Sequence, residues 1–254
     1  MVTQDLRVPF GRAPAAGLGA QITLLVGLWA AGVCLGFAGW LAGTAYALVM
    51  WAVLRSALRR SRTRSFGPAN GVTLARAILV GCVTAIVAQT LGEREPVTAL
   101  IVIAAVALIL DAVDGQVARR TGTASPLGAR FDMEVDAFLI LVLSIFVAHS
   151  FGAWVLSIGA MRYAFVAASR VVPWLRAPLP ASLARKTVAA MQGIVLVVAA
   201  ADVAPRLAAY AAIASALAFL SWSFGRDIVW LWRTRHGRSQ GTGLTGDVPA
   251  PSLR

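Results

Sequence analysis

Residues 111–136 read DAVDGQVARRTGTASPLGARFDMEVD and lie between apolar segments that are long enough to cross a bilayer. Five of the eleven acidic residues of the chain fall in this stretch, and four of them are aspartates, namely Asp111, Asp114, Asp132 and Asp136. A charged side chain at the middle of a bilayer costs about 2.5–3.5 kcal/mol. Four aspartates without partners are therefore unfavourable there, and we expect cations among them.

The spacing of these aspartates predicts two acidic helix faces that meet. Residues three or four positions apart share a face of an α-helix, so Asp111 lies beside Asp114, and Asp132 lies beside Asp136. Residues 121–128 contain glycine, serine, threonine and proline, which predicts a turn between two antiparallel helices. At a rise of 1.5 Å per residue, both pairs lie about 12–13 Å from this turn. We therefore expect all four carboxylates at the same depth.

The composition is that of an integral membrane protein. Hydrophobic residues make up 59% of the chain, charged residues make up 13%, and the mean hydropathy is +0.76. These values lie outside the usual range of soluble domains. We therefore predict an all-α fold, a multi-pass transmembrane helical bundle of about eight spans. The predicted spans are residues 18–36, 39–54, 72–90, 97–118, 129–149, 152–171, 186–203 and 206–224.

The basic residues predict an orientation in the membrane. The net charge is +12, and all but one of the 23 basic residues are arginines, the exception being Lys186. They gather before the first predicted span and in every second loop, whereas the opposite loops contain only Arg94 and Arg206. By the positive-inside rule, both termini and both ends of the aspartate hairpin face the cytoplasm. We expect the protein to lie in the cytoplasmic (cell) membrane. Its partner is then the lipid bilayer, and we expect no nucleic-acid partner.

Four converging carboxylates with no histidine or cysteine nearby form an all-oxygen site. Such a site suits Mg²⁺ or Mn²⁺ rather than zinc, and two divalent cations would balance four charges. Pairs of such cations serve in phosphoryl transfer, and the guanidinium of Arg119 is suited to bind phosphate oxygens. Two alternatives remain open at this point. The aspartates could pair with arginines in a purely structural network, or they could line the path of a cation- or proton-coupled transporter.

The same stretch resembles the signature of the CDP-alcohol phosphatidyltransferase family. The residues have the spacing D-x-x-D-G-x-x-A-R-x8-G-x3-D-x3-D between positions 111 and 136, and every signature position matches. The resemblance covers residues 68–225, a core of six spans. It implies a membrane enzyme, usually a homodimer, that transfers a phosphatidyl or related phospho-alcohol group from a CDP-alcohol to an acceptor hydroxyl and releases CMP. By family analogy the donor is CDP-diacylglycerol, in phospholipid biosynthesis.

The resemblance also implies roles for individual residues. Asp111, Asp114 and Asp132 resemble the metal ligands, and Asp136 lies close to the metals and resembles the proposed general base. Gly128 belongs to the turn of the motif. Gly115, Ala118 and Arg119 match the positions that receive the CDP group. A second, weaker similarity is to the Asn-x-x-Thr-x-x-Arg pattern that opens the first core helix in many relatives, and it adds Asn70, Thr73 and Arg76 as contacts of the nucleotide.

The acceptor pocket has to be predicted from the remaining polar residues. Arg162 falls near the middle of a predicted span, so we expect it to face the same polar cavity, and it is our first candidate. Further candidates are Arg170, Arg185 and Lys186, which could equally extend to lipid headgroups. Glu134 should point away from the metals and pair with a neighbouring arginine. The acceptor itself stays open among glycerol phosphate, inositol phosphate and phosphatidylglycerol.

These predictions divide the chain into five parts. They are an N-terminal cytoplasmic lead (1–16), two additional N-terminal transmembrane helices (17–55), a basic cytoplasmic linker (56–67), the family core (68–225) and a basic, disordered C-terminal tail (226–254).

Overall fold

The computed structural model describes residues 13–60, 68–90, 97–121, 126–177, 179 and 182–240. Every regular element within these ranges is helical, as the sequence predicts. The α-helices are α1 (Ala13–Ala30), α2 (Phe37–Arg60), α3 (Pro68–Thr90), α4 (Val97–Thr121), α5 (Pro126–Phe151), α6 (Leu156–Val171), α7 (Leu183–Ala200) and α8 (Arg206–Gln240). Two short 3₁₀ helices, η1 (Ala153–Val155) and η2 (Pro173–Arg176), flank α6.

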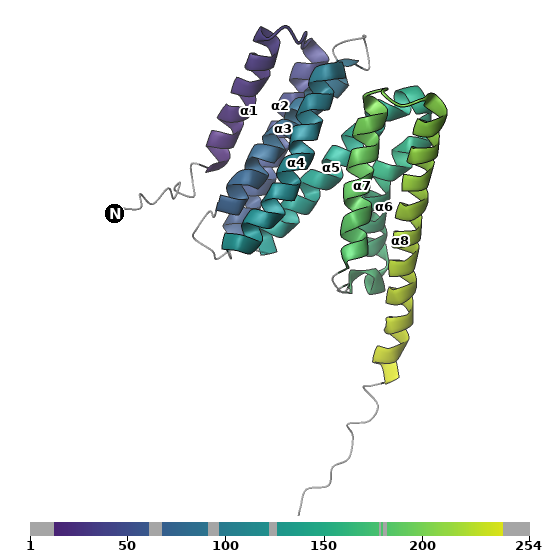
Figure 1. Ribbon diagram of the computed structural model, residues 1–254. Coiled ribbons are helices and arrows are strands. Elements are labelled where there is room, and N and C mark those ends of the chain that lie inside the picture. Colours follow the sequence, from purple (N-terminus) through teal and green to yellow (C-terminus); the bar gives the residue numbers. More distant parts are fainter. Residues whose placement is uncertain are drawn as a thin grey trace, which may run out of the picture.

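The helices form two groups that are joined by α5. Figure 1 shows α1–α4 on one side, α6–α8 on the other, and α5 inclined between them. Helix α3 packs against α1, α2, α4 and α5, whereas α7 packs against α4, α5 and α8. The core between them is built from aliphatic side chains such as Val83, Leu100, Leu143, Leu196 and Ile213, all of which are buried. Helix α3 is therefore the element around which the N-terminal half is arranged.

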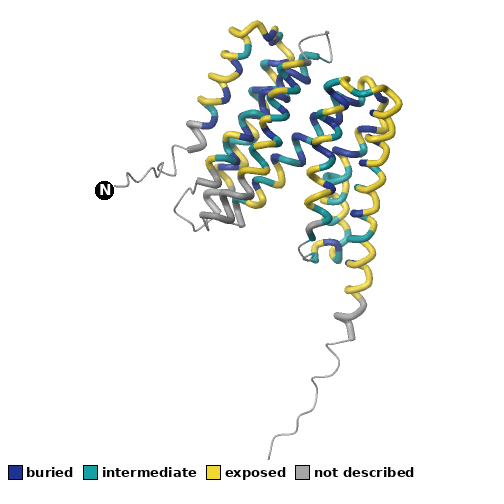
Figure 2. Tube along the Cα trace, viewed as in Figure 1, coloured by how far each residue is buried: buried dark blue, intermediate teal, exposed yellow. Residues whose placement is uncertain are grey.

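The outward faces of the helices are apolar and exposed, as Figure 2 shows for most of α8. Three helical segments among the described residues are long and apolar enough to cross a membrane by length and composition: Phe37–Ser56, Gly71–Thr90 and Arg206–Arg235. Shorter apolar helical segments are Gly17–Ala30 and Thr98–Val113. These features are those of a membrane helical bundle, and the count of eight spans stays a prediction.

Helix α8 corrects the prediction for the start of the C-terminal tail. Residues 226–240, which we expected to be disordered, continue α8 as far as Gln240. Tertiary contacts explain the extension, because Asp227 pairs with Arg185 of α7 at 3.2 Å and Leu231 is buried. The guanidinium of Arg235 also lies 5.9 Å from the ring centre of Trp174 in η2. Residues 241–254 lie outside the described part of the chain.

Two other boundaries differ from the predicted ones. Helix α1 begins at Ala13, inside the predicted N-terminal lead, because its first residues are mainly alanine and Pro14 is tolerated in the first turn. Helix α2 continues to Arg60, inside the predicted basic linker. Residues 1–12 and 61–67 lie outside the described part of the chain.

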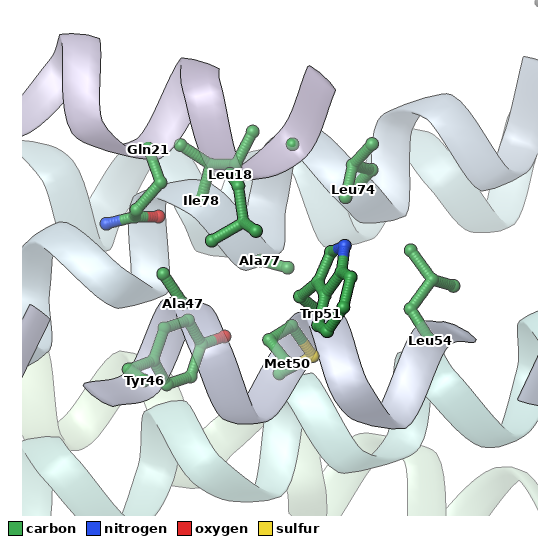
Figure 3. A pocket seen from close by; sticks show the side chains of 11 residues that line it. Leu18, Gln21, Tyr46, Ala47, Met50, Trp51, Leu54, Leu74, Ala77 and Ile78 are labelled. Atoms are coloured by element: carbon green, nitrogen blue, oxygen red, sulfur yellow. The ribbon is translucent and has the colours of Figure 1, made fainter. Parts of the chain in front are cut away.

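The N-terminal pair, α1 and α2, packs directly on α3. Glycines at positions 39 and 43 allow close approach, since a Cβ at Gly39 would lie 3.0 Å from the carbonyl oxygen of Ala85. The backbone N–H of Gly36 donates to Oε1 of Gln89 at 2.9 Å, and Gln21 of α1 reaches Cys82. Side chains of all three helices line a pocket of about 20 Å³, shown in Figure 3. This pocket has room for a single water molecule, so it is a packing gap rather than a substrate site.

Helix α6 lies unusually close to α5. Gly159 is buried, and a Cβ at this position would come within 2.5 Å of the Cα of Leu141 in α5. The neighbour is backbone, so it cannot rotate out of the way. The absence of a side chain at position 159 therefore sets the distance between these two helices.

We predict that Gly159→Ala destabilises the protein by about 1–3 kcal/mol, the usual cost of overpacking. Gly225→Ala is the matched control, because Gly225 is also helical and nothing lies within 4 Å of its Cβ position. This control should leave the melting temperature unchanged or raise it slightly, since alanine favours helix. Thermal unfolding in detergent, followed by circular dichroism, measures both. Equal melting temperatures for the two variants would contradict the proposed close packing.

Candidate functional site

Three helices bring charged residues to one place inside the bundle. Arg76 lies eight positions after the start of α3, Asp111 ten positions before the end of α4, and Asp136 ten positions after the start of α5. These offsets correspond to about 12–15 Å from the same end of the bundle. Asp132 lies one helical turn before Asp136. The equal depth that the sequence predicts for the two acidic faces is thus observed for the described aspartates.

The guanidinium of Arg76 contacts all three of these carboxylates. Its Nη1 donates to Oδ1 of Asp111, and its Nη2 donates to Oδ1 of Asp132 and to the carbonyl oxygen of Asp132 at 3.3 Å. Nη2 also lies 2.7 Å from Oδ1 of Asp136. Burial of a lone guanidinium is costly, so these ion pairs are what allows Arg76 to lie in the core.

The carboxylates are more accessible than the arginine. The side chain of Arg76 is 1% exposed, whereas those of Asp111, Asp132 and Asp136 are 32–37% exposed. One guanidinium against three carboxylates leaves a net charge of −2 on these four side chains. The cluster therefore keeps an accessible side with excess negative charge.

The geometry of the cluster fits a divalent cation. One carboxylate oxygen from each of Asp111, Asp132 and Asp136 lies within 4.8 Å of the others. Oxygens that share a Mg²⁺ or Ca²⁺ ion lie about 2.0–2.6 Å from it, hence at most about 5 Å apart. The donors are all oxygen, which is the set that hard cations prefer. These residues can therefore hold a metal.

Several predicted site residues have side chains outside the described part of the structure. Asp114, Gly115, Ala118 and Arg119 lie on α4, and Asn70 lies on α3, but only their backbone is described. Thr73 is buried one turn before Arg76, and Gly128 is half-buried in the first turn of α5. The predicted roles of these residues in binding CDP stay predictions.

Glu134 and Arg162 form an ion pair beside the cluster. Glu134 points away from the three aspartates, as its position on the helix predicts, and its Oε1 accepts a hydrogen bond from Nη2 of Arg162 at 2.7 Å. The Nε–H of Arg162 is buried and has no hydrogen-bond partner among the described residues. Of the four acceptor candidates, Arg162 is the one with a described contact to α5, the helix that carries Asp132 and Asp136.

The other acceptor candidates occupy different surroundings. Arg185 pairs with Asp227 of α8, while Arg170 and Lys186 are exposed near the ends of α6 and α7. The structure therefore does not bring these three residues together with Arg162.

The contact between Arg76 and the aspartates is not predicted from the sequence. Arg76 was assigned to the nucleotide side of the site by its motif, whereas its described contacts are with carboxylates. Tyr46 of α2 is a second unpredicted neighbour, since its ring lies 5.1 Å from that of Phe138, two residues after Asp136. The one signal for Arg76 was its place inside an apolar span, where an arginine requires an anion.

The fold and the site define a class of protein, a helical membrane bundle with a half-buried acidic site for hard cations. A model of the CDP-alcohol phosphatidyltransferase family matches residues 66–223. The match covers more than half of the chain, so this protein belongs to the CDP-alcohol phosphatidyltransferase family, and the resemblance seen in the sequence is confirmed. No curated protein and no solved structure matches the chain.

Membership in the family gives the coarse chemistry. The family supports transfer of a substituted phosphate group from a CDP-alcohol to an alcohol acceptor, in phospholipid biosynthesis, and it depends in general on divalent metals. Helices α1 and α2 both precede the matched residues. The protein is thus a transferase, and the alternative of a transporter is not needed to explain its intramembrane acids.

We predict that Asp111→Asn does not lower the melting temperature in metal-free buffer. The change reduces the net charge of the four described side chains from −2 to −1, and the amide keeps an oxygen that can accept from Arg76. Asp227→Asn is the matched control, because this acid lies between Arg185 and Arg226 at 3.2 and 3.5 Å. It should lose about 1–3 kcal/mol of stability. A similar loss in both variants would contradict the assigned charge excess.

Proposed function

We propose that this protein transfers a phosphatidyl group from CDP-diacylglycerol to the hydroxyl of an alcohol acceptor and releases CMP. The observation that carries the proposal is the convergence of Asp111, Asp132 and Asp136 from α4 and α5, with the spacing of the family signature. The apolar outer faces of the bundle fit a donor that carries two acyl chains. The acceptor class follows from the neighbouring Arg162, which suits a phosphate-bearing alcohol.

The aspartates are the residues that we propose to hold the metals. Asp111, Asp132 and Asp136 offer oxygens at suitable separations, and Asp114 adds a fourth carboxylate by its place in the motif. Two Mg²⁺ or Mn²⁺ ions, when bound, would neutralise the diphosphate of the donor and stabilise the charge of the leaving CMP. Gly115, Ala118, Arg119, Asn70 and Thr73 are proposed contacts of the CDP group.

Asp136 is the proposed general base. Its side chain is partly accessible, its Oδ1 lies 2.7 Å from Nη2 of Arg76, and it is the last aspartate of the family signature. In the proposed reaction its carboxylate accepts the proton of the acceptor hydroxyl, whose oxygen attacks the β-phosphorus of the donor while the bond to CMP breaks. Arg119 is proposed to bind the phosphate oxygens during this step.

The orientation and the assembly are parts of the same proposal. The aspartate end of the bundle and both termini are proposed to face the cytoplasmic side of the cell membrane, and the arginine-rich loops support this by the positive-inside rule. The donor's nucleotide is water-soluble and would reach the cluster from that side. A homodimer is proposed from the family resemblance, and its test is the mass of the detergent-solubilised protein by light scattering.

We predict that the purified protein releases CMP from CDP-diacylglycerol in the presence of Mg²⁺ or Mn²⁺ and a suitable acceptor. Glycerol phosphate, inositol phosphate and phosphatidylglycerol should be tested in parallel, each with an EDTA control. Asp136→Asn should lower kcat by about 10²–10⁴-fold, the usual contribution of a general base. Asp114→Ala should abolish turnover while the protein stays folded.

The matched control for this assay is Asp202→Asn. Asp202 lies between α7 and α8, at the other end of the bundle, and has a φ of 50°, a conformation that asparagine also adopts. This variant should keep wild-type activity. Absence of CMP release with all three acceptors, or release that EDTA does not stop, would contradict the proposed function.

We further predict that Arg162→Gln raises the KM for a phosphate-bearing acceptor by about 10- to 100-fold, as expected for a lost hydrogen bond to a charged group. The KM for the donor should change little. Arg206→Gln is the control, because Arg206 lies at the opposite end of the bundle, where it contacts the carbonyl oxygen of Ser150. A fall in kcat with no change in the acceptor KM would exclude Arg162 from the acceptor pocket.

A further inference from the structure

Arg76 contacts the same carboxylates that are proposed to hold a metal. Its two terminal nitrogens lie at Oδ1 of Asp111, Asp132 and Asp136, and the ligand oxygens of these residues lie within 4.8 Å of one another. A cation bound by all three aspartates would therefore lie beside a buried positive charge. Either the guanidinium withdraws from these oxygens, or the two cations repel each other at short range.

The hydrogen bonds of Arg76 make this competition direct. Every hydrogen bond that the structure describes for its guanidinium goes to Asp111 or Asp132, and its Nε–H is buried without a partner among the described residues. A cation that takes the carboxylate oxygens thus competes with the two side-chain bonds of the guanidinium and leaves it the 3.3 Å bond to the carbonyl oxygen of Asp132. In return, a divalent charge satisfies the acidic cluster better than the single charge of Arg76, which leaves −2 unbalanced.

We propose that Arg76 is the counter-cation of the metal-free site and that it opposes the binding of divalent cations there. In the metal-free protein it joins α3 to α4 and α5 and relieves the repulsion between the carboxylates. Entry of a divalent cation from the accessible side of the cluster releases it. The inference rests on the proposed function only in that the aspartates must bind a metal.

A purely structural role for Arg76 predicts a different result. If Arg76 only fills space and links helices, its replacement should weaken the fold equally with and without metal, and it should not strengthen metal binding. The competition that we propose has opposite effects on the stability of the metal-free protein and on the affinity for metal. Replacement should destabilise the metal-free protein and tighten the binding of metal.

The test uses the full chain in detergent, without nucleotide, and Mn²⁺ as the probe. Free Mn²⁺ is measured by electron paramagnetic resonance during titration of the wild type, Arg76→Met, Arg76→Lys and the control Arg206→Gln. The control removes one positive charge about 20 Å along α5 from Asp136, because Arg206 contacts Ser150. We expect Arg76→Met to lower the Kd for Mn²⁺ by at least about tenfold, since a change of about 1.4 kcal/mol already gives this factor.

Thermal unfolding of the same proteins supplies the second measurement. In EDTA the melting temperature of Arg76→Met should fall below that of the wild type, and saturating Mn²⁺ should restore it. If Arg76→Met folds only when Mn²⁺ is present, the proposal is supported, because the metal then replaces the missing cation. If Arg76→Met folds under neither condition, the Mn²⁺ affinity of Arg76→Lys tests the proposal instead. A lysine ammonium is a point charge that cannot bridge the carboxylates as a guanidinium does, so Mn²⁺ should bind this variant more tightly than the wild type.

The outcomes separate this inference from the proposed function. If the wild type binds Mn²⁺ and the Arg76 variants bind it with equal or weaker affinity, the inference is overturned. The metal site itself then stays in place. Absence of Mn²⁺ binding in the wild type and in the variants overturns the metal site itself, and the inference with it.

Discussion

The contact on which this structure depends is the set of ion pairs between Arg76 and three aspartates inside an apolar bundle. Neither side is stable alone, because a buried guanidinium needs an anion and three adjacent carboxylates repel one another. The pairs join α3 to α4 and α5 at one depth. Since α3 also packs on α1 and α2, these ion pairs act together with the apolar packing of α3 on α4 and α5 to hold the N-terminal half in place.

The remaining helices support the two helices that carry the aspartates. Helix α2 approaches α3 closely at Gly39 and places the ring of Tyr46 against Phe138 of α5. On the other side, Gly159 lets α6 approach α5 and brings Arg162 to Glu134. Close backbone packing at small residues is how helices associate where lipid removes the hydrophobic driving force. Helix α5 is thus fixed from both sides, and with it two of the three described aspartates.

Much of the site could be predicted because helix periodicity is local. The spacing of Asp132, Glu134 and Asp136 was enough to predict that Glu134 faces away from its two neighbours, and the structure agrees. The partner of the aspartates could not be predicted in this way. Arg76 is 35 residues from Asp111 and 56 from Asp132, and its place in an apolar span indicates that it needs an anion but not which one.

The end of α8 could not be predicted for the same physical reason. Residues 226–240 are rich in arginine and resemble a solvated tail, so their helix was missed. What stabilises it is distant in sequence, because Asp227 needs Arg185 of α7, and Arg235 needs Trp174 of η2. Charge patterns indicate where a chain meets the membrane surface, whereas tertiary contacts decide whether it stays helical there.

Glu134 and Asp136 lie on different faces of α5, and each of them contacts a different arginine. Arg76 approaches Asp136 from α3, and Arg162 lies on α6 and pairs with Glu134. Asp136 belongs to the cluster proposed to bind the donor diphosphate, and its helix α5 also carries Glu134, the partner of the arginine proposed to bind the acceptor phosphate. A base that takes a proton from the acceptor hydroxyl needs this position, since the hydroxyl must reach the phosphorus while its proton leaves on the other side. Asp132 shares α5 and the Glu134–Arg162 ion pair with Asp136, whereas Asp111 lies on α4, so what distinguishes Asp136 as the proposed base is its place as the last aspartate of the family signature.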